Sequence, residues 1–182
     1  VKWRAFWKAE MGMTQHFKMM AAYNGWANRV LYDAAAELTE EEFTRDVGAF
    51  FGSMMGTLNH ILVADRIWMK RFTGEGDAPN RLDAIIHSTM PALRLEREAE
   101  DNRIVEWISG LDDTALEGFF TYVTVVETKT ISQRLAPALS HLFNHQTHHR
   151  GQAHTILSLL NKRPPSLDLI YFQRTDEGQK YT

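Results

Sequence analysis

The chain has 182 residues, a formal net charge of −3 at pH 7, 44% hydrophobic and 24% charged residues, and no cysteine. This is the composition of one globular domain with a sizeable core, and the scattered lysines and arginines argue against a nucleic-acid partner. The lack of cysteine excludes disulfides, thiolate nucleophiles and Cys-based zinc sites, and no apolar run is long enough to suggest a membrane span.

The first twelve residues, VKWRAFWKAEMG, lack the continuous apolar stretch of a signal peptide. Because Met13 could serve as a start, we set residues 1–12 apart as an extension outside the fold. We expect a single domain over residues 13–175, followed by a tail at 176–182, and a cytoplasmic location by default.

Apolar residues recur at a helical period from Thr14 to Leu38, which predicts a first helix with Thr14 as its N-cap. The acidic segment 39–46 is predicted to be a connection. A second helix is predicted from about Ser53 to Phe72, where the glycines of the following TGEGDAP segment stop it.

A third helix is predicted from a cap at Thr89 to about Gly110, with the REAEDNR segment (97–103) as a charged face. Residues 119–132 are rich in β-branched and aromatic side chains, which predicts a short strand pair. The last long helix is predicted over residues 134–161. The fold class is therefore mainly α, a four-helix bundle with a short strand pair before the last helix.

The last predicted helix carries an unusual concentration of histidine. Its core-facing apolar stripe is interrupted at His145 and His149, whose i, i+4 spacing places both side chains on one face. Neutral imidazole is a common ligand of zinc, nickel, copper and iron(II). His141 stands four residues before His145 and forms a second pair of the same spacing, so the pattern leaves both pairs open.

A third ligand has to come from another helix, and His60 is the natural choice. It lies midway along the second helix and off the polar stripe that Asn59, Arg66 and Lys70 form. Three protein nitrogens with open positions are typical of catalytic zinc sites. The alternative for any single histidine on an apolar face is a hydrogen-bonded core residue.

Two familiar helical metal motifs are excluded. The zinc-protease pattern H-E-x-x-H requires a glutamate where this chain has Gln146. Carboxylate-bridged di-iron bundles need Glu-x-x-His on two helices, and no acidic residue stands three positions before any histidine here. These absences favour a mononuclear site.

Four segments carry a resemblance to a known family. They are, in chain order, YNGWANRVL (23–31), FGSMMGTLNHILVADRIWMKRF (51–72), HLFNHQTHHRGQ (141–152) and PPSLDLIYF (164–172). Together they resemble the DinB/YfiT-like metalloenzyme superfamily from Met13 to Phe172. The resemblance implies a four-helix bundle that holds a metal through His60, His145 and His149, which places His141 outside the ligand set.

The same resemblance implies one divalent transition metal, zinc first and nickel or iron as alternatives, together with homodimers. Relatives use such metals for thiol-dependent S-transfer or isomerisation. The first functional hypothesis is therefore a metalloenzyme that activates an external low-molecular-weight thiol and acts on a small-molecule substrate. The alternatives are a hydrolase that uses metal-bound water and a non-catalytic, metal-stabilised binding module.

Several further residues are candidates for the surroundings of the metal. Asp65 could be the base of a hydrolase or pair with Arg66 or Lys70. Four residues of the last helix could line a pocket, support the ligands or make bundle contacts: His141, His148, Arg150 and Gln152. Gly151 lowers helix propensity and predicts a close helix approach. Asn24, Trp26 and Asn28 are expected to be structural.

The pocket entrance is expected near an aromatic and methionine group of Met54, Met55, Trp68 and Phe143. The alternative, which helical spacing favours, is that these side chains pack in the core.

Overall fold

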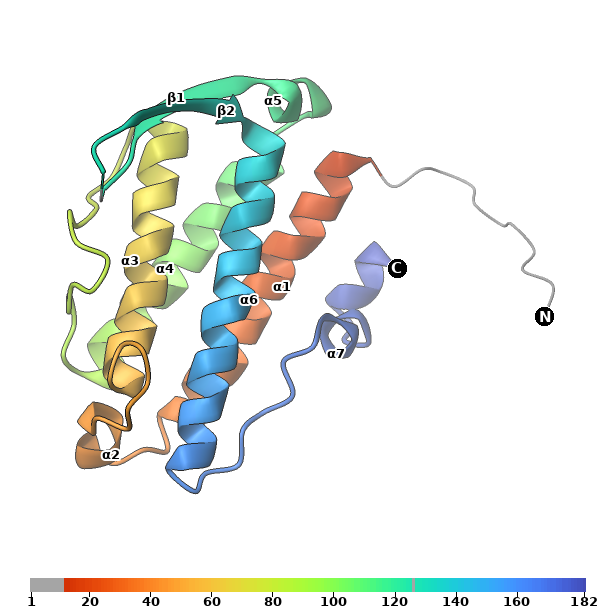
Figure 1. The fold of residues 1–182 in the computed structure, drawn as a ribbon. Coiled ribbons are helices and arrows are strands. Elements are labelled where there is room, and N and C mark those ends of the chain that lie inside the picture. The colour runs from red at the N-terminus through yellow and green to blue at the C-terminus, as the bar shows by residue number, and fades with distance from the viewer. Residues whose placement is uncertain (1–11, 126) are drawn as a thin grey trace.

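The computed structural model describes residues 12–125 and 127–182. Four long helices form a bundle in which α1 packs against α4 and α6, and α3 packs against the same two helices (Figure 1). They are α1 (Met13–Ala35), α3 (Met54–Thr73), α4 (Met90–Ser109) and α6 (Leu135–Leu159). The predicted mainly α fold, a four-helix bundle, is confirmed.

The strand pair also stands where the sequence predicts it. Strands β1 (Phe119–Val123) and β2 (Thr130–Arg134) are antiparallel, with Phe119 opposite Arg134. They lie across one end of the bundle, and α6 follows β2 directly (Figure 1). Short elements complete the chain: α2 (Glu40–Thr44), α5 (Asp113–Glu117), α7 (Leu169–Gln173) and the 3₁₀ helix η1 (Gly178–Tyr181).

Two predictions near the N-terminus are wrong: the bounds and cap of the first helix, and the absence of a helix in segment 39–46. Helix α1 begins after Gly12 and ends at Ala35, and the Thr14 side chain donates to Asp113 instead of capping the helix. The segment 39–46 contains α2 rather than a plain connection. Thr39 and Glu42 form a capping box there, in which each side chain bonds the other residue's backbone N–H.

The apolar core is divided along the length of the bundle. One cluster gathers around Leu31, Leu58 and Ile156, and a second around Trp68 and Leu139. On each long helix a short polar stretch separates the two clusters. These stretches meet in one buried polar layer that crosses the whole bundle.

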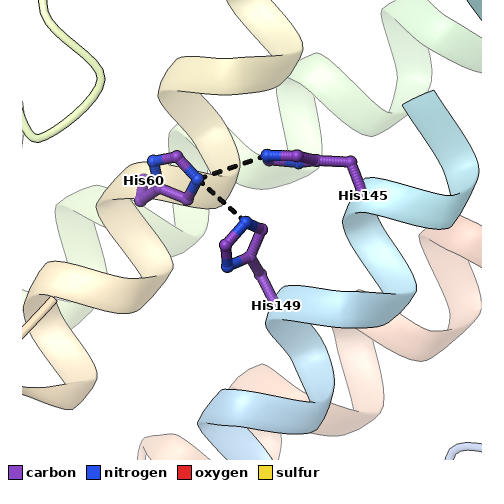
Figure 2. A group of neighbouring side chains, drawn as sticks. All are labelled: His60, His145 and His149. Carbon is purple, nitrogen blue, oxygen red and sulfur yellow. Dashed lines mark hydrogen bonds between the residues drawn. The ribbon is translucent and has the colours of Figure 1, made fainter. Parts of the chain in front are cut away.

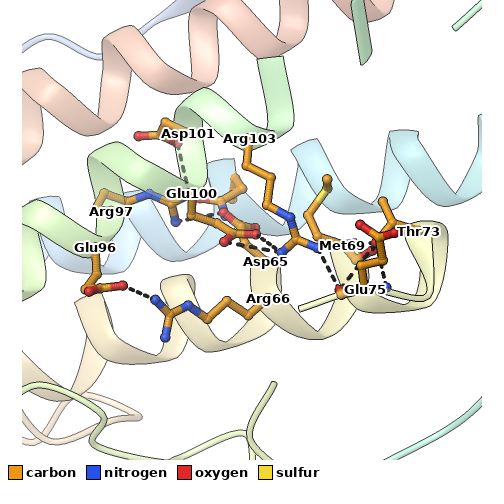
Figure 3. A network of polar contacts seen from close by, with 11 residues as sticks. Asp65, Arg66, Met69, Thr73, Glu75, Glu96, Arg97, Glu100, Asp101 and Arg103 are labelled. Atoms are coloured by element: carbon orange, nitrogen blue, oxygen red, sulfur yellow. Dashed lines mark hydrogen bonds and ion pairs between the residues drawn. The ribbon is translucent and has the colours of Figure 1, made fainter. Parts of the chain in front are cut away.

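Part of the charged face predicted for residues 97–103 is buried in this layer. Arg97 and Asp101 of α4 are only 1% and 7% exposed. Arg97 Nη1 lies 2.7 Å from Asp65 Oδ2, and its Nη2 lies 3.0 Å from Asp101 Oδ1 (Figure 3). A buried charge is tolerated only beside a partner of opposite sign, and here two carboxylates, those of Asp65 and Asp101, face Arg97 and the nearby Arg150.

Helices α1 and α6 complete the layer. Asn28 donates to Asp101 at 2.9 Å, and its side-chain oxygen accepts from Arg150 at 3.2 Å. Asn24 makes the same two kinds of contact. The two asparagines thus have the structural role expected of them, because their side chains link α1 to α4 and α6. Together with Asp65 of α3, they join all four helices at one level.

The C-terminal segment packs back on α1. Phe172 is fully buried against Tyr23 and Trp26. Within the segment 176–182, Glu177 pairs with Arg29 at 3.1 Å, and Tyr181 lies against Phe172. In the described part of the chain, no helix is both long and apolar enough to cross a membrane.

Candidate metal centre

Three histidine side chains converge between α3 and α6. His60 projects from α3, and His145 and His149 project from successive turns of α6 (Figure 2). His60 Nε2 lies 3.3 Å from His145 Nε2 and 3.1 Å from His149 Nε2. All three rings offer a nitrogen within 4.8 Å of the others, and no carboxylate of the described residues joins the group. Such a group could hold a metal ion.

The outer nitrogens of two rings are already engaged. His60 Nδ1 lies 2.7 Å from the backbone carbonyl oxygen of Leu82, which can only accept, so Nδ1 carries the proton. His149 Nδ1 donates to Gln152 Oε1 at 2.8 Å. Each of these neutral rings therefore turns an unprotonated Nε2 toward the centre. Oxygen partners of this kind orient metal-binding histidines and fix their tautomer.

Burial keeps the rings neutral. It lowers the pKa of His60 to about 4, and with the help of His149 and His60 it lowers the pKa of His145 to about 3. The pKa of His149 is also lowered, first by burial. At neutral pH, lone pairs of His60 and His149 thus face each other with no proton between them. A divalent cation relieves that repulsion, so the residues present fit a metal ion.

Asn59 of α3 holds the loop that follows Leu82. Asn59 accepts hydrogen bonds from the backbone N–H groups of Ile86 and His87 at 2.9 and 3.0 Å, and it donates to the His87 carbonyl oxygen at 2.8 Å. Asn59, which the sequence places on a polar stripe with Arg66 and Lys70, is fully buried. Asn59 thus holds residues 86 and 87 of the loop that also contains Leu82, whose carbonyl oxygen contacts His60 Nδ1.

An aromatic ring closes one side of the group. Phe51 stacks on His60 with ring centroids 3.9 Å apart and meets His149 edge-on at 5.6 Å. Gly56 makes this possible, because a Cβ at that position would lie 2.0 Å from the Phe51 carbonyl oxygen. Nothing in the sequence pattern distinguished Phe51 from its neighbour Phe50, which is 84% exposed.

Comparison with known proteins identifies the family of the chain. Residues 13–180 match the model of the DinB family. The chain belongs to the DinB family. It is 22% identical over 150 residues to Protein DinB of Bacillus subtilis (strain 168), across 74% of this chain and 80% of that protein. A crystal structure of a DinB-like protein from Bacillus cereus ATCC 10987 superposes with a TM-score of 0.62 at 16% identity, over 80% and 91% of the two chains, and so shares the fold.

The residues expected around the ligands take distinct positions in this DinB-family protein. Gln152 contacts His149 through its oxygen, and its nitrogen lies 3.2 Å from His148 Nε2 on the exposed side of α6. Asp65 is completely buried and faces Arg97 rather than the histidines or the expected partners Arg66 and Lys70. The suggestion that Asp65 is a base beside the metal is therefore wrong.

Helix α6 connects the histidines to the polar layer. Arg150 belongs to that layer, and Gln146, which the sequence interpretation treated only as a missing glutamate, is fully buried and donates to Asp65. A signal existed: Asn24 and Asn28, like Gln146 and Arg150, are polar pairs at i, i+4 within apolar helix faces. The close approach predicted at Gly151 is wrong, since a Cβ there would meet nothing within 4 Å.

A cavity of about 410 Å³ opens beside the histidines. Its wall includes His145, His141 and Trp68. Partial burial and the neighbouring Arg71 lower the pKa of His141. Of the expected entrance residues only Trp68 lines this cavity; Met54 and Phe143 lie in the core clusters and Met55 packs against one of them.

Proposed function

We propose that this DinB-family protein is a mononuclear metal-dependent enzyme in which His60, His145 and His149 hold one divalent transition metal ion. The observation that carries the proposal is the convergence of three neutral Nε2 atoms, two of them with tautomers set by outer oxygen partners. Zinc suits an all-imidazole site best, with nickel and iron(II) as alternatives.

The reaction we propose is activation of a low-molecular-weight thiol for transfer to a small-molecule electrophile, or for isomerisation of the substrate. A bound divalent cation would lower the pKa of the thiol, as it does for other coordinated thiols. The thiol has to come from outside, because the 182 residues contain no cysteine. The cavity beside His145 provides room for the reactants.

The chain's own residues support this chemistry by orientation and shielding. The Leu82 carbonyl oxygen and Gln152 hold the rings of His60 and His149, and Phe51 covers His60 on one side. A hydrolase is less well supported. A base that takes a proton from water must lie within hydrogen-bond reach of the reacting group, whereas Asp65 is enclosed in the polar layer.

The direct test is to load the protein with zinc and assay conjugation of a panel of cellular thiols to a generic aromatic electrophile. We expect a rate that depends on both zinc and thiol, and its loss in His149→Ala. If no thiol gives zinc-dependent conjugation or isomerisation, the proposal fails. Ester or amide hydrolysis without thiol would favour the hydrolase instead.

We further propose that the protein works as a homodimer in the cytoplasm. The resemblance to the wider superfamily motivates the homodimer, and the cytoplasmic location is the default expectation from the sequence. Sedimentation equilibrium of the purified protein tests the first, since a single species of 21.0 kDa would contradict it. Fractionation of the native host tests the second.

A further inference from the structure

Arg71 differs from the other arginines of its neighbourhood. Arg66, Arg97 and Arg103 each lie beside a carboxylate, those of Glu96, Asp65 and Glu100 respectively (Figure 3). In the part of the chain that the structure describes, no carboxylate lies within 4.0 Å of the Arg71 guanidinium. Glu127, the acidic residue in the same cavity wall, pairs with Lys129.

Aromatic rings hold this guanidinium in place. Arg71 Cζ lies 4.6 Å from the centroid of Trp68 and 4.4 Å from that of Tyr122. A guanidinium that packs through its face keeps its N–H groups, which lie in its plane, available for a ligand. One of them reaches the Val123 carbonyl oxygen at 3.5 Å, a weak contact that leaves other donors free.

The position of Arg71 relates it to the histidines. Arg71, His141 and His145 all line the 410 Å³ cavity. His141 lies between the Arg71 end of the cavity and the histidine end. The centroid of its ring is 5.0 Å from that of Trp68, on which Arg71 packs, and 5.8 Å from that of His145. The remaining wall is largely apolar, with contributions from Ala64, Ile67, Leu82 and Val125.

We infer that this cavity takes a ligand with a carboxylate group, which Arg71 binds while the opposite end of the ligand reaches the three histidines. The inference rests on the proposed function and adds the chemical class of the thiol or its acceptor. Partial burial removes water from the guanidinium, so an anion gains more there than at an exposed arginine. One unpaired cation in a planar group matches a planar monoanion better than a phosphate dianion.

The test uses cobalt(II)-loaded protein and two probes of the same shape, 3-mercaptopropionate and 3-mercaptopropionamide. Binding of either thiol to cobalt is followed by the sulfur-to-cobalt charge-transfer absorption in the near ultraviolet. We expect the carboxylate to bind about tenfold more tightly or better than the amide, because a charge-assisted hydrogen bond contributes on the order of 1.5–3 kcal/mol. Arg71→Gln should remove this preference and leave amide binding unchanged.

Two controls separate the inference from general effects of charge and folding. Arg71→Lys should retain part of the preference. Arg45→Gln, at the exposed residue that follows α2, should leave the preference unchanged. The circular dichroism spectrum of each variant reports whether the bundle is intact. Equal binding of the two probes to wild-type protein, or a preference that survives Arg71→Gln, overturns the inference while the metal–thiol proposal stands.

A second measurement applies even if no thiol binds to cobalt, which would contradict the proposed function. Phenylacetate and phenylacetamide are titrated into metal-free protein and followed by calorimetry, so that a carboxylate cannot act as a metal ligand. We expect binding of phenylacetate alone, and at least a tenfold loss in Arg71→Gln. If metal-free protein does not distinguish the two compounds, and cobalt-loaded protein does not distinguish the two thiols, Arg71 is not a carboxylate site.

Discussion

The Nε2 atoms of His60 and His149 face each other at 3.1 Å, although each ring already donates its Nδ1 proton to an oxygen. Two neutral imidazoles in these tautomers have no hydrogen bond to offer each other. The arrangement is therefore that of a ligand set, in which a cation replaces the missing proton, rather than that of a core hydrogen bond.

The metal content of the protein should depend on all three histidines. Protein purified without a histidine tag is expected to hold about one divalent ion per chain, and His60→Ala, His145→Ala and His149→Ala should each lose most of it, because two imidazoles leave the site incomplete. His16→Ala, at an exposed position, is the control. Elemental analysis with wild-type content in any of the three variants would contradict the proposed ligand set.

Gln152 should set metal affinity without being a ligand. In Gln152→Ala the Nδ1 of His149 loses its acceptor, and loss of such an outer partner weakens metal binding by about 10- to 100-fold. Gln152→Glu keeps an acceptor oxygen and should retain most of the affinity. Competition with a chromophoric chelator measures both. Wild-type affinity in the alanine variant would show that this contact has no part in orienting the ring.

Two glycine substitutions should change stability in opposite directions. Gly56→Ala places a Cβ 2.0 Å from the Phe51 carbonyl oxygen and should lower the free energy of unfolding by about 1–3 kcal/mol. Gly151→Ala meets no atom within 4 Å in the middle of α6 and should raise it by about 0.5–1 kcal/mol. Urea denaturation checks both, and equal effects would refute the difference in packing.

The buried polar layer should be costly to break. Asp65→Asn removes one of the two carboxylates beside Arg97, and breaking a fully buried pair costs about 3–5 kcal/mol. Asp83→Asn breaks an ion pair with Arg81 on the exposed surface and should leave the unfolding midpoint unchanged. A similar midpoint for the two variants would mean that the layer contributes no more than surface charges.

Metal-free protein should lose stability with acid in a defined window. The pKa values of His60 and His145 are lowered from 6.5 to about 4 and about 3, so the unfolded chain takes up protons first as the pH falls below 6.5. Stability contributed by the neutral rings is present above pH 6.5 and declines as the pH falls toward about 4 for His60 and about 3 for His145. Urea midpoints at pH 7.5 and 5 measure it in the presence of a chelator.

The matched variant for this pH effect is His145→Gln, which has one fewer buried imidazole. It should show a smaller difference between the two midpoints than wild-type protein, because one group no longer titrates differently in the folded and unfolded states. An unchanged difference would assign the acid sensitivity to other groups.

The sequence alone was enough for the long helices and for placing His141, His145 and His149 on one helix face, because both depend on local information. The helical period places residues four apart on one face, and glycine, proline and capping residues mark the ends. The spacing left the pairs His141/His145 and His145/His149 open, and the family resemblance selected the second pair together with His60. These predictions did not require knowledge of which helices are neighbours. The helices α3, α4 and α6 lie where the apolar period of the sequence predicts them.

What the tertiary structure decided is the set of contacts between helices. Periodicity indicates that Asp101 or Asn59 lies on a given face, but not whether that face meets solvent, a charged partner or a loop. The buried pairing of Arg97 with Asp65, the stacking of Phe51 on His60 and the cavity beside Arg71 all depend on neighbours distant in sequence. The unprotonated Nε2 atoms of His60 and His149 follow only from the tertiary structure, because it brings the oxygens of Leu82 and Gln152 to the Nδ1 atoms of these rings.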